Sequence, residues 1–302
     1  MPETIGARLV DGAKGKGLDR LGRLFAAFVG AVYRVPGTRP LKNALHGTWL
    51  LRHPLHPAAT DVVVGGLTVV AALDVLSLAQ RDPTLWRATD IALLVSLLFA
   101  AVAGLSGYTD WNETSGNERR LGVFHGVLMT LITLGYVASY WMRVGGGPRE
   151  PAVWLALVLW VALALVAHLG GELVFGFGTG VNRHAWTLLP QKWQRTEVAE
   201  ASLEDRRPVR VKLKNGVSVM VVKLDGVVSA IGETCSHASG PLADGELVGP
   251  ERRDIKCPWH GSVFSLRTGA ALRGPATMGQ PRCELRTAAD GTLELRSLSP
   301  GR

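Results

Sequence analysis

Two pairs of cysteine and histidine residues in the C-terminal part of this 302-residue chain have the types and spacing of metal ligands. Cys235 and His237 are separated by one residue, and Cys257 and His260 by two. A 2Fe–2S cluster can be held by two thiolates on one iron and two imidazoles on the other. Zinc takes the same ligand types, but zinc loops usually separate the members of a pair by two to four residues. The single residue inside the first pair therefore favours the cluster.

The residues around these pairs predict strands that would hold the two ligand loops side by side. From 209 to 214, apolar and charged side chains alternate, which is the pattern of a half-buried strand. Further runs of this kind are separated by dipeptides typical of tight hairpin turns: Asn215-Gly216, Asp225-Gly226 and Asp290-Gly291. We therefore expect an antiparallel all-β domain. The remaining cysteine, Cys283, lies in a predicted strand and is expected to be a buried structural thiol.

Residues 193–300 resemble the Rieske ferredoxin-like domain. The resemblance is carried by these motifs: Cys235-x-His237, Gly240-Pro241-Leu242, Cys257-Pro258-Trp259-His260-Gly261-Ser262, Phe264, Thr268-Gly269 and Gly274-Pro275. It implies a Rieske-type 2Fe–2S cluster, with Cys235 and Cys257 on the inner iron and His237 and His260 on the outer, solvent-facing iron.

The same resemblance implies roles for residues around the cluster. Ser262 would donate a hydrogen bond to a cluster sulfur, and Pro275 would lie over the cluster. Phe264 replaces a tyrosine donor of the quinol-oxidising branch, and Gly240 and Trp259 replace the two cysteines that clamp its cluster loops. A donor to a cluster sulfur stabilises the reduced state and so raises the potential. Because one of the two donors is lost and the clamp is absent, we expect a midpoint low in the Rieske range of about −150 to +300 mV.

Long apolar runs before this domain predict transmembrane helices. Four runs, each near the roughly 20 residues that cross a bilayer, cover residues 62–80, 88–108, 121–143 and 152–176. Short connections make neighbouring helices antiparallel. The expected fold class is an all-α transmembrane four-helix bundle followed by an antiparallel all-β Rieske domain. The expected boundaries are 1–60 for an amphipathic interfacial segment, 61–180 for the bundle, 181–207 for a linker and 208–302 for the Rieske domain.

The N-terminal segment carries an apolar face at helical spacing beside basic residues. The apolar face comprises Leu18, Leu21, Phe25, Phe28, Val29 and Val32, and the basic residues are Lys14, Lys16, Arg20 and Arg23. This pattern predicts an interfacial helix on anionic lipid; a helix packed on the soluble domain is the alternative. The net charge of +8 is concentrated beside apolar spans rather than among exposed aromatic residues, so we expect membrane lipids, and not nucleic acid, as partners.

Basic residues near the ends of the spans predict the orientation of the bundle. One side carries Lys42, Arg52, Arg119, Arg120, Arg183, Lys192 and Arg195, and the other carries Arg81, Arg87, Arg143 and Arg149. The bias predicts a multi-pass protein of the inner (plasma) membrane with both termini in the cytoplasm. The scarcity of cysteine agrees with a reducing compartment.

Residues 46–183 also resemble a family of small bacterial four-helix membrane proteins of unknown function. This looser resemblance rests on His53-Pro54-Leu55-His56-Pro57, Asp61, Asp110-Trp111, His125 and Gly170-Gly171. Ionisable residues inside spans usually face the bundle interior and mark a site. His125 and His168 could be axial ligands of haem b, His168 and Glu172 could line a quinone or metal pocket, or all could be interhelical hydrogen-bonding groups. Asp74 is either a proton-path residue or a partner for a hydroxyl group.

Together these features predict a membrane-anchored one-electron carrier at the cytoplasmic surface, working with a cytoplasmic reductase or oxygenase. The alternatives are an electron-donating component of a multi-subunit oxygenase or reductase, and a quinone- or haem-linked transmembrane redox protein. An oxygenase needs a mononuclear iron on two His and a carboxylate, and no His follows His260. No independent catalytic site is therefore expected in this chain. A transporter or sensor is disfavoured because the sequence shows neither internal repeats nor broken helices.

Overall fold

The computed structural model describes residues 5–10, 12–49 and 51–298. The chain forms two compact units. The first comprises Met1–Leu45 and Pro54–Thr179, and the second comprises His46–His53 and Gly180–Arg302. The second unit is therefore discontinuous in sequence, because a short segment before the long helices belongs to it.

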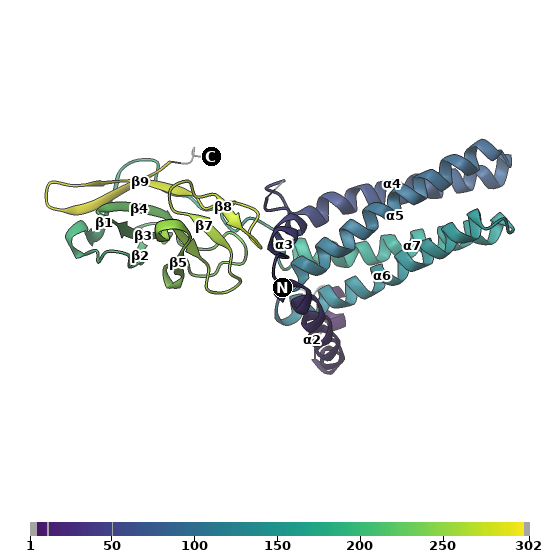
Figure 1. Ribbon diagram of the computed structural model, residues 1–302, viewed down its shortest axis with the longest axis horizontal. Coiled ribbons are helices and arrows are strands. Elements are labelled where there is room, and N and C mark those ends of the chain that lie inside the picture. The colour runs from purple at the N-terminus through teal and green to yellow at the C-terminus, as the bar shows by residue number, and fades with distance from the viewer. Residues whose placement is uncertain (1–4, 11, 50, 299–302) are drawn as a thin grey trace. The chain divides into compact units, whose positions relative to one another are not determined.

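The first unit is helical. Its helices are α1 (Ile5–Val10), α2 (Gly12–Arg34), α3 (Arg39–His46, which ends in the second unit), α4 (Leu55–Gln80), α5 (Pro83–Trp111), α6 (Gly116–Val144) and α7 (Arg149–Phe175). The long helices α4 to α7 run side by side, and α4 packs on both α5 and α7, which closes a four-helix bundle (Figure 1). Each of the four is long and apolar enough to cross a membrane. The predicted four-helix bundle is confirmed.

The outer face of this bundle is largely apolar. Leu98, Leu131 and Leu165 each expose about 60–70 % of their surface, which water would disfavour and a bilayer would not. Tyr136 and Leu93, in contrast, are fully buried inside the bundle. This distribution suits helices whose outer faces contact lipid.

A charged network at one end of the bundle takes one residue from each long helix. Arg143 of α6 donates to both carboxylate oxygens of Asp74 of α4, at 2.7 and 2.6 Å, and both side chains are fully buried. Arg149 of α7 donates to Asp90 of α5, with Nη1 3.0 Å from Oδ2. Arg143 lies 3.9 Å from Asp90, which joins the two pairs. Asp74, for which the sequence left two roles open, therefore has a guanidinium partner.

The N-terminal helix α2 packs within the helical unit. Asp19 accepts two hydrogen bonds of 2.7 Å from Arg120 of α6, and Phe25 stacks on Tyr108 of α5 with ring centroids 5.9 Å apart. Phe28 is exposed. The contacts of α2 are thus with the bundle, while part of its apolar face remains uncovered.

The second unit is built of antiparallel strands in two sheets. The strands are β1 (Gln194–Ala199), β2 (Val209–Lys212), β3 (Ser218–Leu224), β4 (Val227–Gly232), β5 (Glu246–Val248), β6 (Asp254–Lys256), β7 (Val263–Ser265), β8 (Ala271–Arg273), β9 (Arg282–Thr287) and β10 (Thr292–Ser297). The larger sheet has the order β1-β10-β9-β4-β3-β2 and the smaller one β5-β6-β7-β8. The predicted antiparallel all-β domain is confirmed.

The stretch expected to be a linker, 181–207, differs from that expectation because much of it is folded onto the sheets. It contains β1, an edge strand that pairs only with β10 among the described strands. Leu189 is buried in the core of the larger sheet, and the Ser297 N–H donates to the Pro190 carbonyl at 2.6 Å. The few apolar residues of β1 gave no alternation from which this strand could be predicted.

Candidate iron–sulfur site

Two loops carry the predicted ligands and share the same pattern of backbone hydrogen bonds. The first follows β4, and the second joins β6 to β7. In the first loop the Cys235 N–H donates to the Gly240 carbonyl at 2.8 Å, and in the second the Cys257 N–H donates to the Ser262 carbonyl at 2.8 Å. The N–H group of the residue four positions after each cysteine, Ser239 or Gly261, donates to the carbonyl of that cysteine, at 2.9 and 3.1 Å. Each loop is thus a closed turn that holds its Cys and His in place.

The two thiols lie together in the interior of the second unit, which is called the β unit from here on. Cys235 and Cys257 are almost fully buried and hydrogen-bonded to each other. This bond and burial raise the pKa of Cys235, whereas the bond lowers the pKa of Cys257 to about 6. The N–H groups of His237 and Ala238 point to the first sulfur, and those of Trp259 and His260 to the second. Such donors stabilise thiolates and, on a cluster, the reduced state.

The two imidazoles form a second pair closer to solvent. The rings of His237 and His260 are 5.0 Å apart between centroids and nearly perpendicular, and both are half-buried. Trp259, beside His260, exposes 57 % of its surface. Within the described ranges, no three His, Cys, Asp or Glu side chains form a group that could hold a single metal ion. The donors instead divide into a buried thiol pair and an outer imidazole pair, which fits two irons with two protein ligands each.

The residues around the ligands leave space for a cluster and supply a hydrogen-bond donor. A Cβ on Gly240 would lie 2.7 Å from Cys257 Sγ, so the absence of a side chain there keeps the sulfur accessible. Ser262 is buried, and its Oγ accepts the Ala276 N–H at 3.0 Å, which leaves its own O–H proton to donate. Phe264 is fully buried among the core residues that surround both cysteines. Pro275 is buried next to Ala276, after a cis peptide bond. The site therefore fits a 2Fe–2S cluster.

Cys283 lies apart from these ligands in the core of the larger sheet. It is buried and free, and burial raises its pKa to about 12. The prediction of a buried structural thiol is confirmed.

Sequence reasoning missed two polar residues that contact the first ligand loop, His184 and Gln280. Gln280 is buried, and in the orientation that satisfies its amide its oxygen accepts the Ser236 N–H at 2.8 Å. Its nitrogen donates to His184 Nε2 at 2.6 Å and to the Thr234 carbonyl at 3.0 Å. Burial lowers the pKa of His184, which favours the neutral ring, and its Nε2 also lies 2.5 Å from the Thr234 carbonyl. No motif marks these residues, because their roles depend on contacts between distant segments.

At one end of the bundle, two imidazoles have fixed tautomers. Nδ1 of His56 lies 2.8 Å from the Ala103 carbonyl, and Nδ1 of His125 lies 3.2 Å from the Val166 carbonyl. Because a carbonyl can only accept, the proton sits on Nδ1 and each Nε2 presents a lone pair. His56 and His125 are close enough to interact electrostatically.

His168, a possible haem ligand together with His125 by the sequence, lies at a more exposed position than His125. Its side chain is 63 % exposed, and its Nε2 lies 3.4 Å from Oε1 of Glu172. The carboxylate of Glu172 also accepts the Gly6 N–H at 2.8 Å. The imidazole that acts electrostatically on His125 is that of His56.

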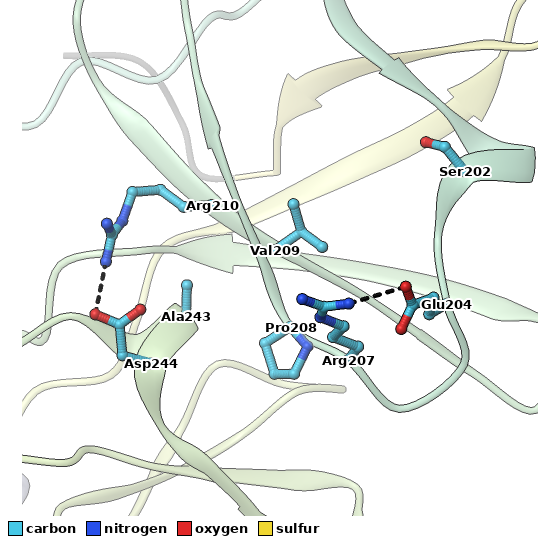
Figure 2. A pocket seen from close by; sticks show the side chains of 8 residues that line it. All are labelled: Ser202, Glu204, Arg207, Pro208, Val209, Arg210, Ala243 and Asp244. Carbon is cyan, nitrogen blue, oxygen red and sulfur yellow. Dashed lines mark hydrogen bonds and ion pairs between the residues drawn. The ribbon is translucent and has the colours of Figure 1, made fainter.

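A shallow pocket of about 300 Å³ on the β unit contains none of these groups (Figure 2). It is lined by Ser202, Glu204, Arg207, Pro208, Val209, Arg210, Ala243 and Asp244. Arg207 donates to Glu204 at 2.8 Å, and Arg210 pairs with Asp244 at 3.1 Å and with Glu233 at 2.8 Å. Both cations of the lining already have carboxylate partners.

Comparison with known proteins agrees with the geometry in both units. Residues 52–183 match the family described as a predicted membrane protein, DUF2231, and residues 193–286 match the Rieske 2Fe–2S domain. The ferredoxin component of the p-cumate 2,3-dioxygenase system of Pseudomonas putida is 35 % identical over 80 residues, which are 26 % of this chain and 61 % of that protein. Human apoptosis-inducing factor 3 is 39 % identical over 67 residues, 22 % of this chain and 10 % of that protein.

Among solved structures, the Sphingomonas yanoikuyae B1 ferredoxin is 29 % identical, with a TM-score of 0.32, and the match covers 36 % of this chain and all of that one. The chain spans about three fifths of the dioxygenase ferredoxin and a tenth of apoptosis-inducing factor 3. The two domain matches, the four apolar helices and the paired thiols and imidazoles agree with one another. The chain is a fusion of a DUF2231 membrane domain with a Rieske 2Fe–2S domain.

Proposed function

We propose that this protein is a membrane-anchored one-electron carrier whose Rieske cluster is held by Cys235, His237, Cys257 and His260 at the cytoplasmic surface of the inner membrane. The observation that carries the proposal is the division of these ligands into a buried thiol pair and an outer imidazole pair. When bound, the cluster supplies a one-electron couple. The buried thiol pair would shield the cluster from water, and the imidazole pair would hold it within reach of a partner protein.

Two observations support the proposed topology. Residues 46–53 and 180–302 form one folded unit, so they lie on the same side of the membrane, as an even number of spans between them requires. Arg143 and Arg149, counted on the outer side, pair with Asp74 and Asp90. Lys42, Arg120 and Arg195 on the side of the termini pair with carboxylates as well. The orientation is therefore proposed from the number of basic residues near the span ends, seven against four, which makes the side of the termini cytoplasmic by the positive-inside rule.

The redox partner is proposed to be a cytoplasmic reductase or oxygenase component. The similarity to the ferredoxin component of a dioxygenase system supports this class of partner. The exposed indole of Trp259 beside His260 offers an apolar contact where an electron would leave. Aromatic residues in such positions are enriched in protein interfaces.

Electron paramagnetic resonance of the dithionite-reduced full-length protein tests the proposal. Mixed imidazole and thiolate ligation should give an average g value below that of the free electron, about 2. Cys235→Ala should abolish this signal, and His237→Cys should change it. Cys283→Ala is the matched control and should leave it intact. A persistent signal in Cys235→Ala would contradict the ligand assignment.

A second candidate function is that of a haem-linked transmembrane redox protein, favoured by the tautomers of His56 and His125. A neutral imidazole whose Nδ1–H is held by a carbonyl is the form that ligates iron through Nε2. Glycine on the neighbouring helix makes room for each ring, since a Cβ on Gly107 or Gly170 would lie 2.7 or 3.1 Å from it. Quinone is the other ligand that such donors could bind.

An absorption spectrum of the full-length protein before and after dithionite distinguishes these possibilities. Bound haem b should give sharp bands that disappear in His56→Ala and in His125→Ala but persist in His168→Ala. A spectrum with only the broad iron–sulfur absorption, after expression with added haem precursor, would exclude haem.

A further inference from the structure

The segment that follows the last membrane helix is folded against the β unit and reaches the first ligand loop. Asn215 Nδ2 donates to the Leu188 carbonyl at 2.8 Å, which fixes the distal part of this segment. Nearer the helix, the Arg183 N–H donates to the Ser236 carbonyl at 3.2 Å. Ser236 is the residue between the ligands Cys235 and His237. The segment therefore contacts the backbone that carries two of the four ligands.

All the polar groups of Ser236 are taken up by such contacts. Its carbonyl accepts from Arg183, its Oγ donates to the Met278 carbonyl at 2.7 Å, and its N–H donates to the Gln280 amide at 2.8 Å. The Gln280 amide is in turn held by His184 Nε2 at 2.6 Å. Two of the three anchors of Ser236 thus involve residues 183 and 184, one directly and one through Gln280.

The segment that precedes the first membrane helix makes an equivalent contact on the second ligand loop. Thr48 Oγ1 donates to the Ala276 carbonyl at 3.0 Å, and the contact is buried. The N–H of Ala276 donates to Oγ of Ser262, the last residue of the second loop. A Cβ on Gly274 would lie 2.7 Å from Thr48 Oγ1, which shows how closely the two segments approach. The segment after the last membrane helix therefore reaches the first ligand loop both directly, through Arg183, and through Gln280. The segment before the first membrane helix reaches the second loop through Ala276.

We propose that His184 and Thr48 are positioning residues for the cluster: the two segments that flank the membrane helices fix the ligand loops and so set the reduction potential. The N–H groups that point to Cys235 Sγ belong to the loop that Ser236 anchors. These donors stabilise the reduced cluster, and loosening the loop weakens them. The expected direction is a lower potential. This inference rests on the cluster assignment and not on the identity of the redox partner.

Redox titration of the full-length protein, followed by electron paramagnetic resonance, tests the proposal with two pairs of variants. His184→Leu and Thr48→Val remove the polar contacts, whereas His184→Gln keeps a polar group that can donate or accept and Thr48→Ser keeps the hydroxyl. We expect each of the first pair to lower the ratio of reduced to oxidised cluster about tenfold at a fixed potential, a shift of about 59 mV for one electron, with altered g values. The second pair should restore the wild-type potential.

Asn215→Ala is the matched control, because it loosens the same segment without touching a ligand loop. It should leave both the potential and the g values unchanged. The proposal is overturned if Asn215→Ala shifts the potential as much as His184→Leu, or if all variants keep the wild-type potential. If His184→Leu fails to fold, the comparison of Thr48→Val with Thr48→Ser still decides. A wild-type protein without any Rieske signal would instead refute the proposed function.

Discussion

At the residue scale, the two ligand loops differ in the residue that closes each turn. Ser239 and Gly261, four positions after Cys235 and Cys257, both have a left-handed backbone, with φ of 66° and 72°. This conformation costs an L-residue with a side chain about 1–2 kcal/mol, but costs glycine little. The first loop therefore carries strain that the second avoids.

We expect Gly261→Ala to lower the free energy of unfolding of the protein by about 1–2 kcal/mol, because the new Cβ meets this backbone penalty. Ser239→Gly relieves the penalty but adds chain entropy to the unfolded state, so its net effect should be within about 1 kcal/mol of neutral. Thermal unfolding monitored by cluster absorption measures both. Equal destabilisation by the two changes would show that the left-handed backbone at these two positions does not determine their effect on stability.

The hydroxyl of Ser262 should raise the reduction potential, because it accepts from Ala276 and keeps a proton to donate to a cluster sulfur. Ser262→Ala should therefore lower the midpoint. Ser265→Ala, on the strand that follows, removes a hydroxyl that accepts from the Thr268 N–H and should leave the potential unchanged. Protein-film voltammetry gives both midpoints, and an unchanged potential in Ser262→Ala would exclude this donor role.

Spacing and residue type were enough to predict Cys235, His237, Cys257 and His260 as candidate ligands, because each pair lies within one short loop. His184, Gln280 and Thr48 could not be predicted in this way. Each acts through a contact with a residue far away in the sequence, and nothing in its local pattern records that contact.

At the scale of elements, the four long helices were predictable because their apolar runs match the thickness of a bilayer. Their polar interior was not. Arg143 was counted as a basic residue near the end of a span that sets the orientation, yet it is buried within the bundle against Asp74. Hydropathy along one helix cannot reveal a partner on another.

Removing one member of this buried pair should be costly, because the other charge is left without its partner. We expect Asp74→Leu to lower the stability of the bundle by about 3–5 kcal/mol, and Asp74→Leu with Arg143→Leu to recover most of that loss. Unfolding of the full-length protein in mixed detergent measures both. A double variant that is less stable than Asp74→Leu would show that the two residues do not act as a pair.

At the scale of the whole molecule, the proposed topology predicts the compartment of every loop. A fluorescent-protein fusion after Arg302 should be fluorescent, as in the cytoplasm. An alkaline phosphatase inserted between Gly146 and Gly147, in the loop between α6 and α7, should be active, as outside the membrane. Activity of the phosphatase at the C-terminus would reverse the orientation, while leaving the four-helix architecture intact.

The discontinuity of the β unit has a consequence for biosynthesis. Residues 46–53 leave the ribosome before the first membrane helix, but the strands they pack against are made after the last one. Residues 46–53 can therefore fold onto the β unit only after the four helices have been synthesised, and only then can Thr48 contact Ala276. The cluster loops acquire their full set of contacts only on a chain that is already inserted, so iron–sulfur assembly is expected to act on this protein at the membrane, as its last maturation step.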